Sequence, residues 1–188
     1  MSISCPYQWH ASLAARIIRA GGVVAYPTET TWGLGCDPFQ QSAVERILRI
    51  KQRPMHKGLI VIADHLEQLS GLIEPLTEAQ QEMIQKHTAK PTTWIVPAAS
   101  YAPEWISGQH SSVAVRITTH PLSREICRRV GPIVSTSANR AGQPVLTARW
   151  PCVRQFYQEV DWILPGQSGS ASSASQIIDL LTGKILRH

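Results

Sequence analysis

Short apolar runs of β character alternate along this chain with segments of helical periodicity, and this alternation most constrains the fold. The runs that favour strands lie at 23–26, 59–62, 92–96, 113–117 and 132–135. Segments that favour helices lie at 9–20, 42–51, 77–87, 121–130 and 148–159, and short strands are expected near 161–164, 175–178 and 184–187. Such alternation is typical of α/β or mixed α+β proteins. We therefore expect one twisted mixed sheet with flanking helices.

The length of 188 residues predicts one domain spanning 1–188. No apolar run approaches the roughly 18 residues that span a bilayer. The first residues lack a basic stretch followed by an apolar one, so we expect no secretory signal and a cytoplasmic protein without a membrane partner. The four cysteines show neither CxxC nor zinc-ligand spacing, which predicts reduced thiols and no metal site.

Local signals predict where three of the helices begin and which faces they bury. Ser42–Glu45 and Thr77–Gln80 have the spacing of capping boxes, and Pro121 suits a first helical turn. In the first helix the apolar positions are Leu13, Ile17 and Ile18. In the second they are Val44, Ile47 and Leu48, and Lys51 falls on the same face one turn further on.

Charge favours anionic partners. The chain has 18 Lys and Arg against 13 Asp and Glu, a net charge of +5. The span from Arg116 to Arg154 is rich in arginine and contains one acid, Glu125. Such a balance suits nucleotides, RNA or phosphate, although a merely basic soluble protein is the alternative.

Three polar clusters follow predicted strands or helices. Residues 27–35 carry three threonines after a buried strand, and 135–139 (STSAN) follow another. Both could bind a small polar ligand or an anion, or could be turns whose hydroxyls cap backbone groups. Residues 51–58 carry Lys51, Arg53 and Lys57, which suit a triphosphate or could simply complement a helix dipole. Lys51 argues for an anion, because an unpaired ammonium on a core-facing stripe is costly.

Arg116 occupies an inward position of its predicted strand. Alternation places Ala114 and Arg116 on one face and three aliphatic residues on the other. A strand arginine in a sheet needs an anion, either a bound one or an internal partner such as Glu29.

Other features limit the chemistry. A P-loop, a complete dinucleotide fingerprint and a GxSxG elbow are all absent from the sequence. Carboxylates are few and none form a general acid–base pair, so an enzyme would work by positioning and charge stabilisation. Residues 166–175 (GQSGSASSAS) favour a flexible surface loop or a lid over a site.

Taken together, five ordered motifs resemble the YrdC family over about 22–187, most closely its short bacterial members. They are YPTETTWGLG at 26–35, KQRP at 51–54 with KGL at 57–59, SVAVR at 112–116, HP at 120–121 and STSAN at 135–139. The resemblance implies a twisted α/β sheet whose basic concave face holds the site. It also implies a reaction in which L-threonine, bicarbonate or CO₂, and ATP give threonylcarbamoyl-adenylate and pyrophosphate, for N6-threonylcarbamoylation of adenosine 37 in tRNA.

The resemblance also implies roles for individual residues. Lys51 and Arg53 would be the catalytic cations that meet the ATP phosphates. The implied threonine contacts are Thr28, Arg116, Ser137 and Ser175. The further implied ATP contacts are Ser112, Asn139, Thr147 and Arg187. Mg²⁺ would be carried by the ATP phosphates, and the adenylate would pass to a threonylcarbamoyl-transferase complex.

The chain departs from the family pattern at one turn. The family usually has Pro-Gly-Pro-x-Thr before its central strand, whereas this chain has Ala89-Lys90-Pro91-Thr92-Thr93. A glycine used for its backbone freedom is not always replaceable, so the geometry of this turn is open.

Two alternative functions are considered beside the enzyme. The first is a non-catalytic module that binds tRNA or double-stranded RNA on its basic face, in ribosome maturation for example. The second is a carbamoyl-phosphate-dependent carbamoyltransferase, because larger proteins of this fold handle carbamoyl-adenylates.

Overall fold

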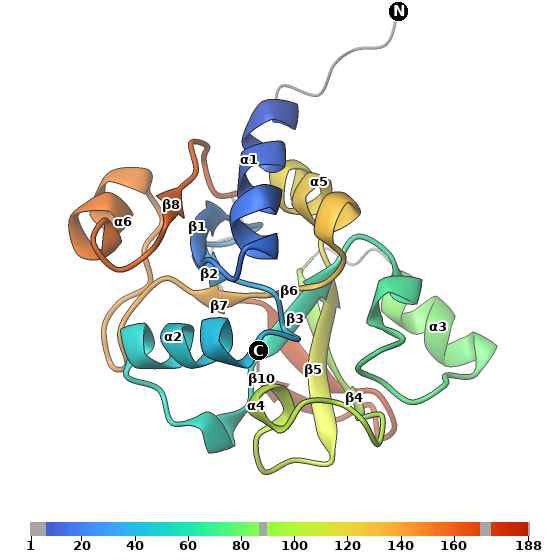
Figure 1. Ribbon diagram of the computed structural model, residues 1–188. Helices are drawn as coiled ribbons and strands as arrows, with labels where there is room; N and C mark the ends of the chain where they lie inside the picture. Colours follow the sequence, from blue (N-terminus) through green and yellow to red (C-terminus); the bar gives the residue numbers. More distant parts are fainter. Residues whose placement is uncertain (1–6, 87–89, 170–173, 188) are drawn as a thin grey trace, which may run out of the picture.

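In the computed structural model, residues 7–86, 90–169 and 174–187 are described, and they form two mixed β-sheets with helices around them (Figure 1). The end of the helix predicted to reach His87, the family turn at Ala89 and the centre of the Gly/Ser stretch at 170–173 lie outside these residues. The helices are α1 (Gln8–Arg19), α2 (Gln41–Lys51), α3 (Glu78–Gln85), α4 (Glu104–Ser107), α5 (Pro121–Val130) and α6 (Arg149–Phe156), with 3₁₀ turns at Met55–Lys57 and Leu66–Leu69.

The expectation of a single sheet is wrong, because the strands divide into two. The smaller sheet has the order β7-β2-β1-β8 and the larger has the order β10-β9-β4-β5-β3-β6. The strands are β1 (Val24–Pro27), β2 (Trp32–Gly35), β3 (Ile60–Ala63), β4 (Thr92–Pro97), β5 (Ser112–Ile117), β6 (Ile133–Val134), β7 (Thr136–Ser137), β8 (Trp162–Ile163), β9 (Gln176–Asp179) and β10 (Ile185–Arg187).

The second sheet was not predicted from the sequence because two of its strands, β2 and β7, lie in stretches that were interpreted as polar loops. Residues 32–35, interpreted as part of a polar loop, form β2, which pairs antiparallel with β1 in a hairpin. Likewise β6 pairs with β3 in the larger sheet, and β7, which begins two residues later, pairs with β2 in the smaller one. The chain therefore crosses between the sheets at Ser135, within a stretch that reads as one short strand.

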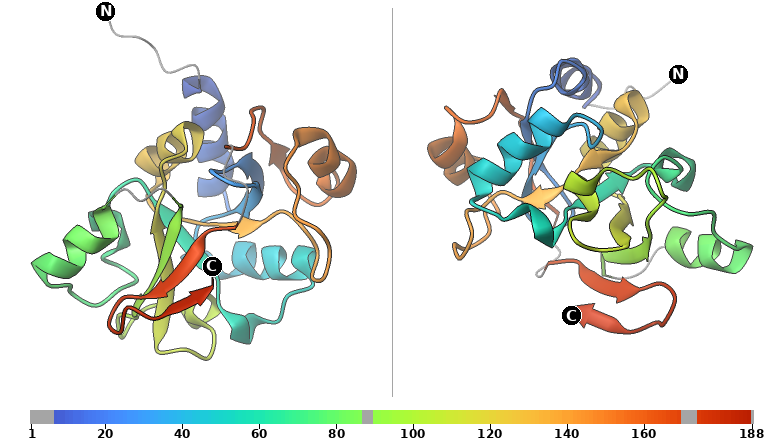
Figure 2. Two further views of the ribbon diagram at one scale, coloured as in Figure 1. Left: turned by 180° about the vertical axis from the view of Figure 1, so that it is seen from behind. Right: turned by 60° about the horizontal axis from the view of Figure 1, so that its bottom comes forward.

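The C-terminal hairpin forms one edge of the larger sheet. Strand β9 pairs parallel with β4, and β10 pairs antiparallel with β9 and is the edge strand. Seen from behind in Figure 2, this hairpin lies beside β4 and brings the last described residues to the level of the sheet. It therefore places residues from the end of the chain near β4 and β5, which come from its middle.

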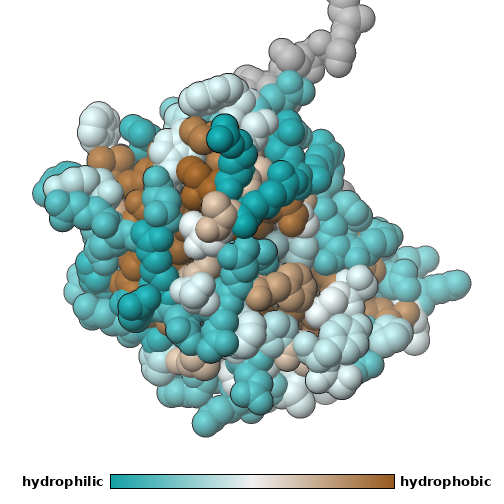
Figure 3. Space-filling model, in the orientation of Figure 1, coloured by the Kyte–Doolittle hydropathy of each residue, from teal (hydrophilic) through white to brown (hydrophobic). Residues whose placement is uncertain are grey.

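The hydrophobic core links the two sheets. Its larger cluster includes Ala25 and Leu34 from the smaller sheet together with Val61 and Val115 from the larger one. A second cluster lies beneath α1 and α5. On the face shown in Figure 3 most residues are hydrophilic, and the hydrophobic ones appear mainly around α1 and between α1 and α6.

Packing changes the predicted face of the first helix and keeps that of the second. In α1 the buried residues are Ala11, Ala14, Ala15 and Ile18, whereas Leu13 and Ile17 are only half-buried. Small alanines let the backbone approach its neighbours closely, which apolar periodicity alone does not indicate. In α2 the predicted face of Val44, Ile47, Leu48 and Lys51 is buried as expected.

One of the two predicted capping boxes is wrong. Helix α2 starts at Gln41, and its N-cap Gln40 makes no side-chain cap bond, so Ser42 lies inside the helix. Asp37 fixes this earlier start, because its carboxylate accepts bonds from the Phe39 amide (2.9 Å) and the Gln40 side chain (3.2 Å). The box at Thr77 is confirmed, with bonds in both directions between Thr77 and Gln80.

Candidate active site

A cavity of about 570 Å³ is lined by residues of both sheets. Seven of the ten residues implied by the family motifs line it: Thr28, Arg53, Ser112, Arg116, Ser137, Ser175 and Arg187. They come from six separate segments of the chain. The fold therefore brings together most of the predicted set, while Lys51, Asn139 and Thr147 do not line the cavity.

The turn between β1 and β2 forms one wall, and its threonines have different roles. The Thr28 hydroxyl donates to the Thr31 carbonyl oxygen at 2.8 Å and accepts from the backbone amides of Thr30 and Thr31. This is the turn-capping arrangement that was the alternative to ligand binding. Thr30 and Thr31 also line the cavity, so their side chains extend the polar wall beyond the predicted Thr28.

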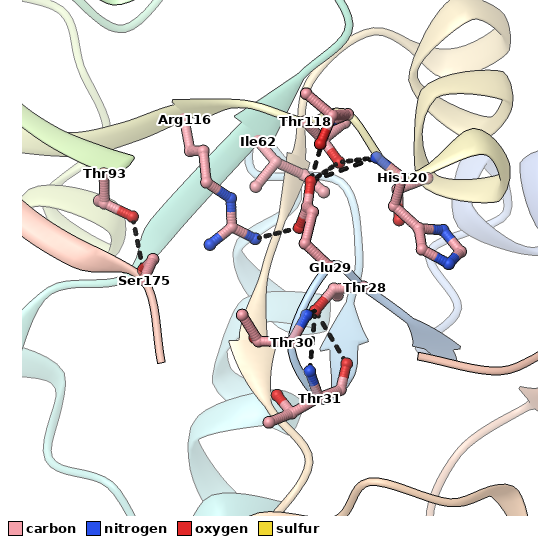
Figure 4. Close-up of polar contacts among 12 residues, drawn as sticks. Thr28, Glu29, Thr30, Thr31, Ile62, Thr93, Arg116, Thr118, His120 and Ser175 are labelled. Carbon is pink, nitrogen blue, oxygen red and sulfur yellow. Dashed lines mark hydrogen bonds and ion pairs between the residues drawn. The ribbon is translucent and has the colours of Figure 1, made fainter. Parts of the chain in front are cut away.

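Arg116 enters the cavity from β5 and is paired with Glu29. Its Nη2 lies 3.3 Å from Glu29 Oε2, and both side chains are less than one-tenth exposed. The internal partner considered from the sequence is therefore present. Figure 4 shows the guanidinium between Ser175 and Glu29, above Thr30. Within the described residues, Arg116 Nε is buried without a hydrogen-bond partner, so the protein itself does not saturate the guanidinium, and the residue also lines the cavity.

Glu29 reaches from the smaller sheet to the segment after β5. Its Oε1 accepts bonds from the Thr118 hydroxyl (2.5 Å) and the backbone amides of Thr119 (2.8 Å) and His120 (3.3 Å). Burial by itself would raise the pKa of Glu29, but the charge of Arg116 and these hydrogen bonds outweigh it and lower the pKa. Glu29 is therefore an ionised carboxylate inside the protein.

Ser175 and Arg187 form the opposite wall. The Arg187 guanidinium donates to the Ser175 carbonyl oxygen (3.0 and 2.7 Å) and to its hydroxyl (3.1 Å), and Ser175 also shares a 2.9 Å bond with Thr93. Burial and then the nearby charge of Arg116 lower the pKa of Arg187. Two guanidinium groups thus lie near each other in the cavity wall.

Arg53 reaches the cavity because α2 ends in an unusual conformation. The C-cap residue Gln52 is left-handed, with φ of 53°, the one non-glycine residue with positive φ in the described chain. The Arg53 guanidinium then donates to the carbonyl oxygens of Lys57 (3.3 Å) and Gly58 (3.0 Å). Lys57, a member of the predicted triphosphate cluster, also lines the cavity, as does His110, for which the sequence predicted no role.

Lys51 lies behind the wall rather than in it. Its ammonium donates to the Ser137 carbonyl oxygen, and to the carbonyl (2.8 Å) and side-chain oxygen (3.3 Å) of Asn139. Buried Lys51 is therefore not unpaired, because neutral oxygens of the Ser137–Asn139 segment accept its hydrogen bonds, although they supply no negative charge. Burial and then the charge of Arg53 lower the pKa of Lys51 to about 8.

The rest of the STSAN segment is bound internally. The Ser137 hydroxyl donates to Asn139 Oδ1 at 2.7 Å, and Asn139 Nδ2 donates to the Gln143 carbonyl oxygen at 2.6 Å. The Thr147 carbonyl oxygen accepts a bond from Ser168 at 2.9 Å. In this structure the side chain of Asn139 thus shapes the loop.

This fold and site define an α/β protein with a cation-lined cavity between two mixed sheets. A family model that matches residues 16–188 is that of Sua5/YciO/YrdC, described as "Telomere recombination". The chain therefore belongs to the Sua5/YciO/YrdC family.

Named relatives and solved structures agree with this membership. The chain is 48% identical to the "Threonylcarbamoyl-AMP synthase" of Pseudomonas paraeruginosa, over 95% of this chain and 97% of that protein. The protein of the same name from Pseudomonas aeruginosa is 47% identical with the same coverage. P. abyssi Sua5 complexed with L-threonine superposes with a TM-score of 0.87 at 31% identity, over 95% of this chain and 53% of that one. E. coli YciO, at 24% identity and a TM-score of 0.83, shares the fold.

Proposed function

We propose that this protein is an enzyme that condenses L-threonine, bicarbonate or CO₂, and ATP to threonylcarbamoyl-AMP and pyrophosphate. The observation that carries the proposal is the convergence of seven motif residues on one cavity, in a chain nearly half identical to synthases of that name. We class it as a nucleotidyltransferase that acts in the cytoplasm in tRNA modification. The core shared by both sheets supports a single domain spanning 1–188.

The geometry suits a reaction without a covalent enzyme intermediate. The threonine amine attacks CO₂ with release of a proton, or bicarbonate with loss of water, to form a carbamate, and a carbamate oxygen attacks the α-phosphorus of ATP while pyrophosphate leaves. Both steps bring anions close together, and fixed cations stabilise the charge that develops. Arg53, Arg116 and Arg187 supply these cations in the cavity wall.

Each residue contributes through what it can reach. We assign the threonine carboxylate to Arg116, with Ser137, Ser175 and the Thr28 turn around the amino acid. We assign the phosphates to Arg53, with Ser112 and Arg187 as further ATP contacts. Lys51 and Asn139 would act by shaping the loop that presents Ser137, and Thr147 would reach ATP only after a rearrangement.

Mg²⁺ would enter with the nucleotide. Within the described residues no group of three or more His, Cys, Asp or Glu is placed to hold a metal ion. Triphosphate oxygens and water are ligands that Mg²⁺ accepts readily. We therefore assign its binding to the phosphates of ATP.

The catalytic interpretation is favoured over the RNA-binding module and the carbamoyltransferase, because the relatives that match the chain over its length are named as synthases. The predicted RNA patch is also partly neutralised, since Arg128 and Arg129 pair with Asp64 and Glu125. An acceptor complex and a tRNA contact remain proposals. In the described residues, no helix is long and apolar enough to cross a membrane.

The test is pyrophosphate release by the purified protein with ATP, Mg²⁺ and bicarbonate. Release that depends on L-threonine, with serine much weaker, is expected. Arg53→Ala should abolish it, whereas Arg49→Ala, at an exposed position of the helix that precedes Arg53, should not. A folded protein that releases no pyrophosphate in the presence of threonine, or an Arg53→Ala variant with normal turnover, would overturn the proposal.

A further inference from the structure

The Glu29–Arg116 pair is incompletely satisfied. Glu29 Oε1 accepts three hydrogen bonds. Its other oxygen, Oε2, lies 3.3 Å from Arg116 Nη2 and accepts no hydrogen bond from the part of the chain that the structure describes. Buried polar atoms normally find partners, so an orphaned atom on each side of the same pair calls for an explanation. Arg116 lines a cavity that a substrate would fill, and Glu29 lies behind it, between the lining residues Thr28 and Thr30 in sequence.

The carboxylate is fixed independently of the arginine. Three bonds to residues 118–120 anchor Oε1 at the junction of β5 and α5. The main chain of Glu29 is also enclosed, because a Cβ on Gly169 would come within 2.4 Å of the Glu29 carbonyl oxygen. The second oxygen, Oε2, is therefore presented to Arg116 at a position set by the backbone of two other segments.

The local charge leaves room for one more anion. Arg116 and Arg187 face the cavity near each other, and Glu29 is the one carboxylate paired with either of them among the described residues. Arg187 is held by Ser175 instead. Because one carboxylate faces two guanidinium groups, Glu29 holds Arg116 in place while the cavity wall keeps a net positive charge.

We propose that Glu29 is a positioning residue that orients Arg116 for the substrate carboxylate while leaving its remaining N–H groups free for that ligand. The inference rests on the proposed function and deepens it. Without Glu29, the flexible Arg116 side chain has no fixed partner in the cavity wall. Part of the binding free energy of the amino acid is then spent on ordering that side chain, so the affinity for threonine falls. Loss of Glu29 therefore weakens the binding of threonine and leaves the binding of ATP unchanged.

The chain offers a matched control for removing a buried carboxylate. Asp64 has the same side-chain exposure as Glu29, 9%, and is also bound by arginines, Arg124 (2.6 Å) and Arg128 (2.9 Å). Asp64 does not line the cavity. Asp64→Asn thus makes the same chemical change as Glu29→Gln at a carboxylate of equal side-chain exposure, whose arginine partners do not line the cavity.

The experiment measures pyrophosphate release for wild type, Glu29→Gln, Glu29→Asp and Asp64→Asn, with L-threonine and ATP varied separately. Glu29→Gln is expected to raise the KM for threonine at least tenfold, with the KM for ATP and the kcat at saturating threonine within about threefold. Glu29→Asp, which keeps the charge, should recover part of this loss. Asp64→Asn should leave the KM for threonine within twofold.

The controls separate this inference from the proposed function. Absence of threonine-dependent release by wild type would reject the proposed function. Normal wild-type release with an unchanged KM for threonine in Glu29→Gln, or equal increases in both KM values, would overturn the positioning role alone. If Glu29→Gln does not fold, as judged by circular dichroism, Glu29→Asp decides: a rise confined to the KM for threonine supports the role, and unchanged KM values contradict it.

Discussion

Two carboxylate–arginine clusters in this protein use the same chemistry in different surroundings. Asp64 binds Arg124 and Arg128 with direct contacts of 2.6 and 2.9 Å, and these arginines are roughly half exposed. Glu29 faces Arg116 at 3.3 Å, with both side chains buried and an atom of each lacking a hydrogen bond. The first cluster is saturated and ties α5 to the end of β3. The second is left incomplete beside a cavity, which is where a ligand would complete it.

The two clusters differ in burial and position: Arg116 is buried and lines the cavity, whereas the arginines bound to Asp64 are about half exposed and lie outside it. Exposed arginines lose little when a partner is removed, because water replaces it. A buried guanidinium has no such substitute, so its unfilled hydrogen-bonding capacity is available to a substrate.

Removing the arginine itself should separate the clusters most clearly. We expect Arg116→Ala to lower kcat/KM for threonine by about 100-fold or more, because a buried charged hydrogen-bond donor is lost and Glu29 is left unpaired. For Arg124→Ala, kcat/KM for threonine should stay within about twofold of the wild-type value. Steady-state kinetics of both variants check this. Equal losses would show that the two pairs are not functionally different.

The second guanidinium of the cavity should matter less than the first. Arg187 holds Ser175 through three contacts, so Arg187→Ala is expected to raise the KM for threonine about tenfold, in the range of charged hydrogen bonds. Lys184→Ala, on the same hairpin, serves as control. A normal KM for threonine in Arg187→Ala would show that Arg187 does not position Ser175 for the amino acid, and a normal KM for ATP as well would exclude Arg187 from the site.

Lys51 should give a pH signature in stability. Its folded-state pKa of about 8 lies below the ordinary lysine pKa of 10.5, so the unfolded chain binds more protons between these values. Its contribution to the free energy of unfolding therefore rises as pH increases from about 8 to 10.5, and is lost as pH falls through 8. Urea denaturation of wild type and Lys51→Met across this range measures it, since other titrating groups cancel in the difference. A difference independent of pH would mean that the carbonyl bonds keep the ammonium protonated.

The smallest effect is expected on the outer face. Arg128 and Arg129 are already paired with Asp64 and Glu125, so Arg128→Gln with Arg129→Gln should leave turnover within about twofold. The salt dependence of any RNA binding should also stay unchanged. A flatter salt slope in filter-binding titrations would show that this patch contacts RNA phosphates after all.

Some elements of the fold could be predicted from local sequence patterns, and others could not. The capping box at Thr77, helix α5 and the buried face of α2 follow from local spacing and are confirmed. The capping box at Ser42 failed because Asp37 started the helix earlier. Strand β2 was hidden by threonine and glycine residues, which usually signal turns, and it is stable because it pairs with β1 and β7.

The sequence by itself determined the residues that carry charge and hydroxyls, their order, and the alternation of strands and helices. These features depend on short-range periodicity and on motif spacing, which involve residues close together in the sequence. Only the tertiary structure decided that Arg53, Arg116 and Arg187 share a cavity while Lys51 is enclosed by carbonyl oxygens behind it. Whether a cation faces a cavity or a loop depends on contacts between residues up to about ninety positions apart, such as Glu29 with Thr118 and Lys51 with Asn139. Such contacts arise only when the two sheets pack together.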